Sequence, residues 1–285
     1  MSKARAKINL ALHVTGRRGD GYHLLDSLVV FADIGDLLHI APAQQTGLDI
    51  VGPFGDGLRV ESDNLVLQAF HSLSNALQHS LSCTDFRLEK NLPVSSGIGG
   101  GSADAAAALN GLVDLWQVDI DRNELAKIAL TLGADVPVCL AGNNCRMQGI
   151  GEDLTAVDFP RMDCVLINPG VGVSTPEVFK ELALPIDRPA FAPLSDLPAS
   201  KQISGWIEWL AASRNDLQDA AIKLTPVIEQ TLAALEQTGS CQLARMSGSG
   251  ATCFGLFANG DDARKAAETI ASDHPDWWVV ATQVG

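Results

Sequence analysis

Residues 93–104 read PVSSGIGGGSAD and run directly into an apolar stripe with helical spacing, so this stretch decides the fold. Four glycines fall within residues 97–101, and they let the backbone approach a polyphosphate with its N–H groups turned inward. A helix that begins at the end of the stretch adds free N–H donors and the positive end of its dipole. The stretch therefore predicts an anion site. The alternative is a flexible turn, in which so many glycines would cost much backbone entropy.

The stretch differs from two common nucleotide-binding motifs. No Gly-Lys-Ser/Thr follows the glycines, so the stretch is not a Walker A loop. Ser102 stands where a dinucleotide fingerprint needs its last glycine, which excludes that motif as well.

The segment before the glycines is predicted to be rich in β structure. Apolar and polar positions alternate over residues 8–14, as in a half-buried strand. We expect further strands over 24–31, 37–40 and 86–89, and a loop around a short strand at 47–57. Apolar residues at helical spacing predict a helix over 65–77, which Ser62 or Asp63 can cap.

Helices and strands alternate after the glycines. The stripe over 105–116 predicts a helix, and a second helix begins near Asp121 and ends at Gly133. The remaining pattern predicts strands at 165–167, 253–257 and 278–284, with helices at 203–210, 227–235 and 263–270. Residues 184–198 hold four prolines and predict a surface loop or a connection between lobes. This order indicates two α+β lobes that meet near residues 150–165.

The composition limits the classes of partner. The chain has 285 residues with 20 Lys+Arg against 34 Asp+Glu, a net charge of −14. This acidic balance argues against a broad nucleic-acid or anionic-membrane surface, although a small basic pocket remains possible. The sequence has no run of about 18 apolar residues, so no membrane span is predicted. The interrupted apolar run at 8–14 lacks a following cleavage site and is interpreted as mature protein.

The six cysteines include no C-x-x-C pair and no histidine at metal-binding spacing. They are predicted to be small buried side chains in a reducing cytosol, rather than disulfides or zinc ligands.

Several single residues are candidates for chemistry, and each has a plain structural alternative. Asp135 follows a helix end and has apolar neighbours, which suits either a solvated turn or a partly buried carboxylate. Lys7 opens the first strand and by itself predicts only a surface lysine. Tyr22, the chain's only tyrosine, lies with His23 in a turn that suits a hairpin or a ligand contact. Residues 247–250, Ser-Gly-Ser-Gly, form a second small-residue loop or a tight turn.

Together these segments closely resemble the GHMP kinases, a family of small-molecule kinases. The resemblance covers nearly the whole chain, and its motifs lie at residues 6–10, 18–23, 93–108, 133–137, 149–152, 174–179, 215–217 and 246–252. There are departures: Arg5 stands where the family usually has proline, Ser95-Ser96 replace glycine-rich positions, and Ala103 replaces a common second serine. None of them removes a group that the chemistry requires.

The resemblance implies an α+β, two-lobe GHMP kinase fold with the active site in the cleft between the lobes. It implies an ATP-binding domain over 1–155 and a C-terminal family domain over 156–285. ATP would be the co-substrate with Mg²⁺, whose ligands stay unknown, and its γ-phosphoryl group would pass directly to a substrate hydroxyl. Asp135 would be the general base, and Lys7, close by in such a fold, would keep Asp135 ionised and stabilise charge on the attacking oxygen.

The resemblance also implies binding residues. The adenine would lie near Asn64, Leu65 and Lys90. The triphosphate would lie on the glycine-rich stretch: Pro93, Val94, Ser95, Ser96, Gly97, Ile98, Gly99, Gly100, Gly101, Ser102 and Ala103. The substrate would be a cytidine-diphosphate-linked alcohol, with its cytosine between Tyr22 and Phe179, hydrogen-bonded by His23, and its alcohol end near Asn9.

Two alternatives remain at this point. The same fold could act on another small alcohol of the homoserine or mevalonate type. The presence of Tyr22 and its turn argues against this alternative. A non-catalytic nucleotide-binding protein would be expected to have lost Asp135 or Lys7, and both are present. We further expect a cytoplasmic monomer or weak homodimer with no nucleic-acid or membrane partner.

Overall fold

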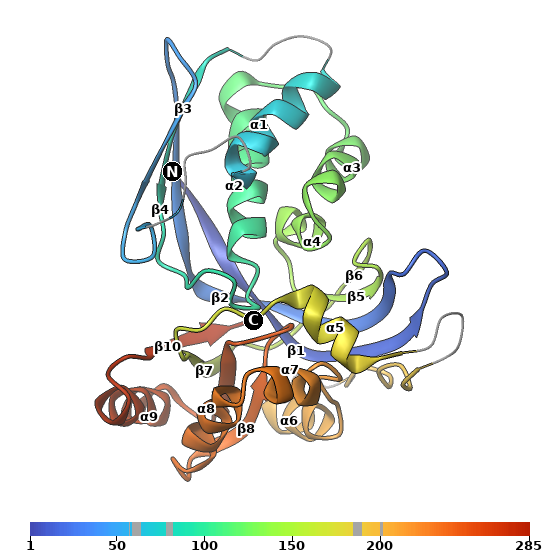
Figure 1. Ribbon diagram of the computed structural model, residues 1–285, viewed down its shortest axis with the longest axis vertical. Helices are drawn as coiled ribbons and strands as arrows, with labels where there is room; N and C mark the ends of the chain where they lie inside the picture. Colours follow the sequence, from blue (N-terminus) through green and yellow to red (C-terminus); the bar gives the residue numbers. More distant parts are fainter. Residues whose placement is uncertain (57, 59–63, 78–81, 185–189, 200–201) are drawn as a thin grey trace. The chain divides into compact units, whose positions relative to one another are not determined.

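The computed structural model describes residues 1–56, 58, 64–77, 82–184, 190–199 and 202–285 (Figure 1). The chain divides into two compact units, each built from separate stretches of sequence. Unit 1 comprises residues 1–6, 34–94 and 99–142, and unit 2 comprises residues 7–33, 95–98 and 143–285.

Unit 1 is a small sheet packed against helices. β4 (Thr84–Glu89) pairs in parallel with β3 (Gly47–Val51) and antiparallel with residues 37–42 of β2 (His23–Pro42). Figure 1 shows α1 to α4 together on one side of these strands. The helices are α1 (Leu65–Ala76), α2 (Gly100–Trp116), α3 (Arg122–Leu132) and α4 (Val136–Ala141). Their apolar faces and those of β2 and β4 form one buried cluster that includes Phe86, Leu73 and Leu112.

Unit 2 holds a second antiparallel array. β10 (Trp278–Val284) pairs with β7 (Met162–Asn168), β7 with β9 (Cys253–Phe257), and β9 with β8 (Cys241–Met246). The first part of β2 pairs with β5 (Cys145–Gly149), which pairs with β6 (Asp153–Ala156). β1 (Ser2–Arg17) pairs with β2.

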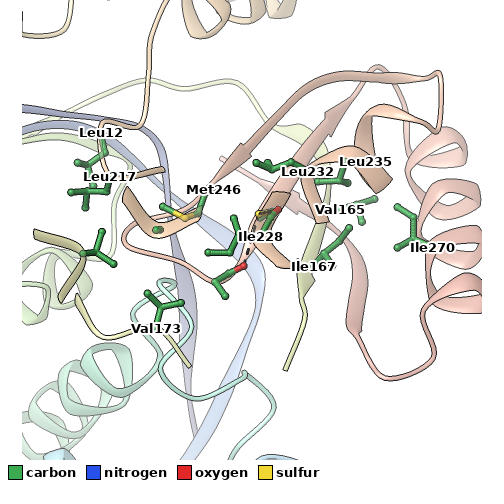
Figure 2. Close-up of a cluster of buried hydrophobic side chains, with 14 of the residues drawn as sticks. Leu12, Val165, Ile167, Val173, Leu217, Ile228, Leu232, Leu235, Met246 and Ile270 are labelled. Carbon is green, nitrogen blue, oxygen red and sulfur yellow. Dashed lines mark hydrogen bonds between the residues drawn. The ribbon is translucent and has the colours of Figure 1, made fainter. Parts of the chain in front are cut away.

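The helices of unit 2 are α5 (Thr175–Leu182), α6 (Ile203–Ala211), α7 (Gln218–Leu224), α8 (Val227–Glu236) and α9 (Gly260–Asp273). Its core is a continuous buried cluster in which Leu12 of β1 lies beside Leu217 and Met246 (Figure 2). A strand near the N-terminus therefore completes a core that is otherwise built by the second half of the chain.

The sequence predicted most elements in kind, and two of them, at 253–257 and 278–284, residue for residue. It missed β5, β6, β8, α4, α5 and α7, which are short. The strands expected at 24–31 and 37–40 are one strand, β2, and the prediction of two was wrong. Asn64 caps α1, whereas the predicted caps Ser62 and Asp63 lie outside the described residues. The domain boundary at 155 stays a prediction.

Among the described residues, none of the helices is both long and apolar enough to cross a membrane.

Candidate active site

The second half of the glycine-rich stretch forms the start of α2 in unit 1. Gly99 is the N-cap, with φ 67°, and as a glycine it has no side chain with which to cap the helix. The first-turn N–H groups of a helix have no acceptor within the helix, and the dipole places positive charge at this end. The start of α2 therefore offers free backbone donors, and the anion site expected there stays a prediction.

The first half of the stretch, residues 95–98, interlocks with the second small-residue loop within unit 2. A Cβ at Gly97 would lie 2.6 Å from the carbonyl oxygen of Ser247, and one at Gly248 would lie 2.6 Å from the carbonyl oxygen of Gly97. Both glycines have positive φ, 76° and 56°. The Thr252 N–H donates to the Ser96 carbonyl at 3.0 Å. The backbones of the two loops thus touch where any side chain would separate them.

Lys7 is buried, only 3% exposed, within β1. Taken alone, the sequence predicted a surface lysine here, and that prediction was wrong. Its Nζ donates to Asn9 Oδ1 at 2.9 Å, and Asn9 Nδ2 donates to Ser27 Oγ at 2.8 Å. Ser27 Oγ in turn donates to the Ala11 carbonyl at 2.7 Å. This chain of bonds fixes the direction of the Lys7 side chain, because each group has a defined partner.

Lys90 is also buried, and its ammonium contacts two carboxylates. Nζ donates to Asp104 Oδ2 at 2.7 Å and to Asp36 Oδ2. Asp36 Oδ1 also accepts the N–H groups of Asn91 and Leu92 at 2.6 and 2.8 Å. Burial lowers the pKa of Lys90, but the carboxylates of Asp104 and Asp36 outweigh this effect and raise it. Lys90, Asp36 and Asp104 therefore connect the chain before Pro93 to the first turns of α2.

Asp104 is the weakly satisfied member of this group. Its Oδ1 is buried without a hydrogen-bond partner among the described residues. Burial raises the pKa of Asp104 to about 7, although the Lys90 ammonium opposes the shift. Neither Asp36 nor Asp104 was singled out from the sequence, since a single aspartate carries no sign of a distant lysine partner.

Asn64 and Leu65, the other residues predicted to lie near adenine, stand at the start of α1. Asn64 Oδ1 accepts the Val66 N–H at 3.0 Å, which occupies its side-chain oxygen as a helix cap. Leu65 is half-buried and packs against the unit 1 core.

Asp135 is half-buried at the N-cap position of α4. Its side chain makes no capping hydrogen bond, and Pro137 occupies the first turn. Asp135 therefore lies at the end of α4 where the helix dipole places positive charge.

Tyr22 ends the turn between β1 and β2, and His23 is the first residue of β2. Phe179 lies on α5. The rings of His23 and Phe179 stack with centroids 4.5 Å apart and planes 22° apart, while Tyr22 is 58% exposed. His23 Nε2 is buried without a hydrogen-bond partner among the described residues. Burial, with a smaller effect from Arg17, lowers the pKa of His23, so the ring is neutral near pH 7. A neutral imidazole carries one donor and one acceptor.

Metal-binding clusters and disulfides are absent from the part of the chain that the structure describes. No group of three His, Cys, Asp or Glu side chains could hold a metal ion there, and all six cysteines are free thiols. Cys145, Cys164 and Cys253 are buried as predicted. The prediction of buried side chains was wrong for Cys83, which is exposed, and for Cys139 and Cys241, which are half-buried.

Comparison with known proteins identifies relatives over the full length. Family models described as "GHMP kinases N terminal domain" and "GHMP kinases C terminal" match residues 64–143 and 197–276. A 4-diphosphocytidyl-2-C-methyl-D-erythritol kinase of Cereibacter sphaeroides is 53% identical over 99% of this chain and 98% of its own length. One of Mesorhizobium japonicum is 49% identical over 98% and 94%.

Solved structures agree on the fold. A crystal structure of a 4-(cytidine 5'-diphospho)-2C-methyl-D-erythritol kinase matches with a TM-score of 0.79 and 34% identity, over 100% of this chain and 98% of that one. The L. major mevalonate kinase matches with a TM-score of 0.69 at 16% identity, over 100% and 96%, and supports the fold alone.

Proposed function

The chain belongs to the GHMP kinase family, and from that membership we propose that it transfers the γ-phosphoryl group of ATP to the 2-hydroxyl of 4-diphosphocytidyl-2-C-methyl-D-erythritol. The observation that supports this substrate is the 53% identity, over 99% of the chain, to a kinase whose name contains that substrate. The reaction belongs to the non-mevalonate route to isoprenoid precursors.

We assign the proton transfer to Asp135. Phosphoryl transfer asks the protein mainly for positioning and electrostatic stabilisation, with a base that accepts the hydroxyl proton. Asp135 stands at the N-cap position of α4, and its side chain makes no capping hydrogen bond there. Lys7, held by Asn9, supplies the fixed positive charge that stabilises the attacking oxygen.

The triphosphate lies on the glycine-rich stretch in this proposal. The start of α2, where the N-cap Gly99 has no side chain, gives N–H donors at Gly100, Gly101 and Ser102, which fits an anion. Asn64, Leu65 and Lys90 border the adenine. The Lys90 ammonium is already bound by two carboxylates, so its contribution to adenine comes from its backbone or its methylene stem.

Tyr22, His23 and Phe179 bind the cytosine in this proposal, and Asn9 borders the alcohol end. His23 Nε2 has no hydrogen-bond partner within the described part of the chain, so this polar atom of a neutral ring is the one that bonds the base edge. His23 covers one face of Phe179, so a base stacked on Phe179 takes its other face. The exposed Tyr22 ring provides the second stacking surface.

Mg²⁺ accompanies ATP in this proposal. Phosphate oxygens and water supply most ligands of such an ion, and Ser102 offers a hydroxyl in the first turn of α2. The ion neutralises charge on the phosphates when bound. We also propose a cytoplasmic enzyme that is a monomer or a weak homodimer.

One experiment separates this function from its alternatives. A coupled assay of ADP release would compare the cytidine substrate, homoserine and mevalonate in parallel, each with and without enzyme. We expect turnover with the cytidine substrate alone. Turnover with homoserine or mevalonate instead would assign another small alcohol, and ATP binding without turnover of any of the three would indicate a non-catalytic nucleotide-binding protein.

A further inference from the structure

The motif Asn215-Asp216-Leu217 has no role in the mechanism so far, yet its asparagine is fully engaged. Asn215 is 7% exposed. Its Nδ2 donates to the carbonyl oxygens of Met246 and Gly248, at 2.8 and 2.9 Å, and its Oδ1 accepts the Leu217 N–H at 3.0 Å. The side chain therefore fixes both ends of the turn that contains Ser247.

Ser247 passes this constraint to two other segments. Its Oγ accepts the Asn9 N–H at 3.1 Å and donates to the Gly97 carbonyl at 3.2 Å. Ser247 has no exposed surface. The turn held by Asn215 is thus bonded to β1 on one side and to the glycine-rich stretch on the other.

The glycines make this contact rigid. The backbone of Gly97 lies against Ser247 and Gly250, and the backbone of Gly248 lies against Gly97, with no room for a Cβ at either position. A displacement of residues 246–250 would therefore displace Gly97, because packed backbones have no space to absorb it.

The same turn reaches Lys7 through Asn9. Ser247 holds the backbone N–H of Asn9, while the Asn9 side chain accepts from Lys7 and donates to Ser27. Asn9 is completely buried. The backbone and the side chain of Asn9 are both fixed, so the turn also determines the position of Lys7.

We propose that Asn215 is a positioning residue of the kinase reaction, which sets Gly97 and Lys7 through the Ser247 turn. The inference rests on the proposed function, since it assumes that Gly97 borders the triphosphate and that Lys7 stabilises the attacking oxygen. In this proposal Asn215 itself touches neither the triphosphate nor the attacking oxygen.

Asp216 provides the matched control, because its bonds serve β1 and not the turn. Its Oδ2 accepts the Val14 N–H at 2.9 Å, and its N–H donates to the Leu12 carbonyl at 2.9 Å. Arg214 donates to its Oδ1 at 2.8 Å. Asn215→Ala and Asp216→Ala therefore truncate adjacent side chains that each hold several bonds, but only Asn215 holds residues 246–248.

The experiment compares the parent, Asn215→Ala, Asp216→Ala and Ser247→Ala in the full chain. Each protein is measured for Tm, for the Kd of a non-hydrolysable ATP analogue by calorimetry, and for kcat and both KM values. A misplacement of about 1 Å costs up to about 10²-fold in rate. We therefore expect Asn215→Ala to raise the analogue Kd and lower kcat, each by about tenfold or more, with KM for the cytidine substrate within about threefold.

The Tm of Asp216→Ala should fall by an amount comparable to the fall for Asn215→Ala. The Kd of Asp216→Ala for the analogue should stay within about threefold of the parent value. Ser247→Ala should reproduce the kinetic pattern of Asn215→Ala, and it carries the test if Asn215→Ala does not fold. In the Asn215→Ala/Ser247→Ala double variant the losses should be less than additive, as for residues acting in one path.

Equal changes of Kd and kcat in Asn215→Ala and Asp216→Ala would overturn the inference, and so would fully additive losses in the double variant. If the parent fails to phosphorylate the cytidine substrate, the proposed function fails. The analogue Kd still decides whether Asn215 positions the nucleotide site.

Discussion

Asp135 has the most specific proposed role at the scale of single residues, that of the general base. Asp135→Asn keeps the shape of the side chain and removes its capacity to accept a proton. Because general-base catalysis contributes roughly 10²–10⁴-fold, we expect kcat to fall at least about 10²-fold, with the Kd for ATP nearly unchanged. Asp114→Asn, on the exposed side of α2, is the control and should retain parental kcat. A kcat of Asp135→Asn within about tenfold of the parent would reject Asp135 as the base.

Asp104 makes stability depend on pH. Its pKa is about 7 in the folded chain and about 4 in an unfolded one. Between these values the folded state binds the extra proton, so this carboxyl lowers the free energy of unfolding as pH rises. Asp104→Asn carries no charge at any pH. In urea unfolding, we expect the free energy of unfolding of the variant to rise relative to that of the parent from pH 5 to pH 8. The rise should be at most about 1.4 kcal/mol per unit of pKa shift.

The pH dependence of this difference is the informative quantity, since the substitution also changes the contact between residue 104 and the Lys90 ammonium. Asp114→Asn should show no such dependence, because its side chain is exposed. A difference that stays constant from pH 5 to pH 8 would contradict the raised pKa and show that Asp104 is ionised throughout that range.

Tyr22 tests the cytosine site. A stacked base loses roughly 1–3 kcal/mol when its aromatic partner is removed, about 5- to 150-fold in affinity. We expect Tyr22→Ala to raise KM for the cytidine substrate by such a factor and to leave KM for ATP nearly unchanged. Some loss of kcat is compatible with this role, because remote binding energy helps to align the reacting hydroxyl. Steady-state kinetics with each substrate varied in turn would measure both constants, and an effect on KM for ATP alone would reverse the two assignments.

At the scale of elements, the contact between the two small-residue loops depends on Gly97. An alanine Cβ there would lie 2.6 Å from the Ser247 carbonyl oxygen, in a backbone conformation with φ 76°. We expect Gly97→Ala to weaken ATP binding by about tenfold or more, because the loop must move to relieve the collision. Calorimetry with a non-hydrolysable ATP analogue would measure the change.

Gly205→Ala is the matched control for this substitution. Gly205 lies within α6, and a Cβ there would meet nothing within 4 Å. Alanine is favoured over glycine within a helix by about 0.5–1 kcal/mol, so this variant should bind the analogue normally and have a slightly higher Tm. Unchanged binding by a folded Gly97→Ala protein would contradict the close contact of the loops.

Strand β2 shows why an element can defeat local prediction. The strands predicted at 24–31 and 37–40 are separated by Gly35-Asp36, a pair that in isolation favours a turn. In the structure a Cβ at Gly35 would collide with the backbone of Ala4, so the glycine permits the close approach of β1. Asp36 is buried and paired with Lys90, a partner that lies 54 residues away in sequence. Long-range contacts therefore override the local signal in both cases.

At the scale of the whole molecule, unit 2 does not follow a single cut in the sequence. Leu12 and Val14 belong to its core, and Arg245 donates to the Leu10 carbonyl at 2.7 Å. Arg245 is buried, and burial lowers its pKa to about 10. A fragment 156–285 lacks the strands that satisfy these groups.

We therefore expect the fragment 156–285 to show no cooperative thermal transition, because its core is incomplete and its buried arginine loses an acceptor. Circular dichroism would follow its unfolding beside that of the full chain. Addition of a separately produced 1–155 fragment should restore a transition, since it supplies the missing strands. A fragment that unfolds cooperatively near the Tm of the full chain would support independent domains divided at 155.

The sequence by itself determined the α+β class and the helix that starts in the glycine-rich stretch, because glycine spacing and apolar periodicity are local signals. Its motifs carried the resemblance to the family. It also picked out Lys7, Asp135, Tyr22 and His23, through motifs that lie within a few residues of each other. Only the tertiary structure decided that Lys7 is buried and held by Asn9, that Lys90 is bound by Asp36 and Asp104, and that Asn215 holds the Ser247 turn. These contacts join residues from distant parts of the chain or depend on burial, and both properties arise only when the core closes.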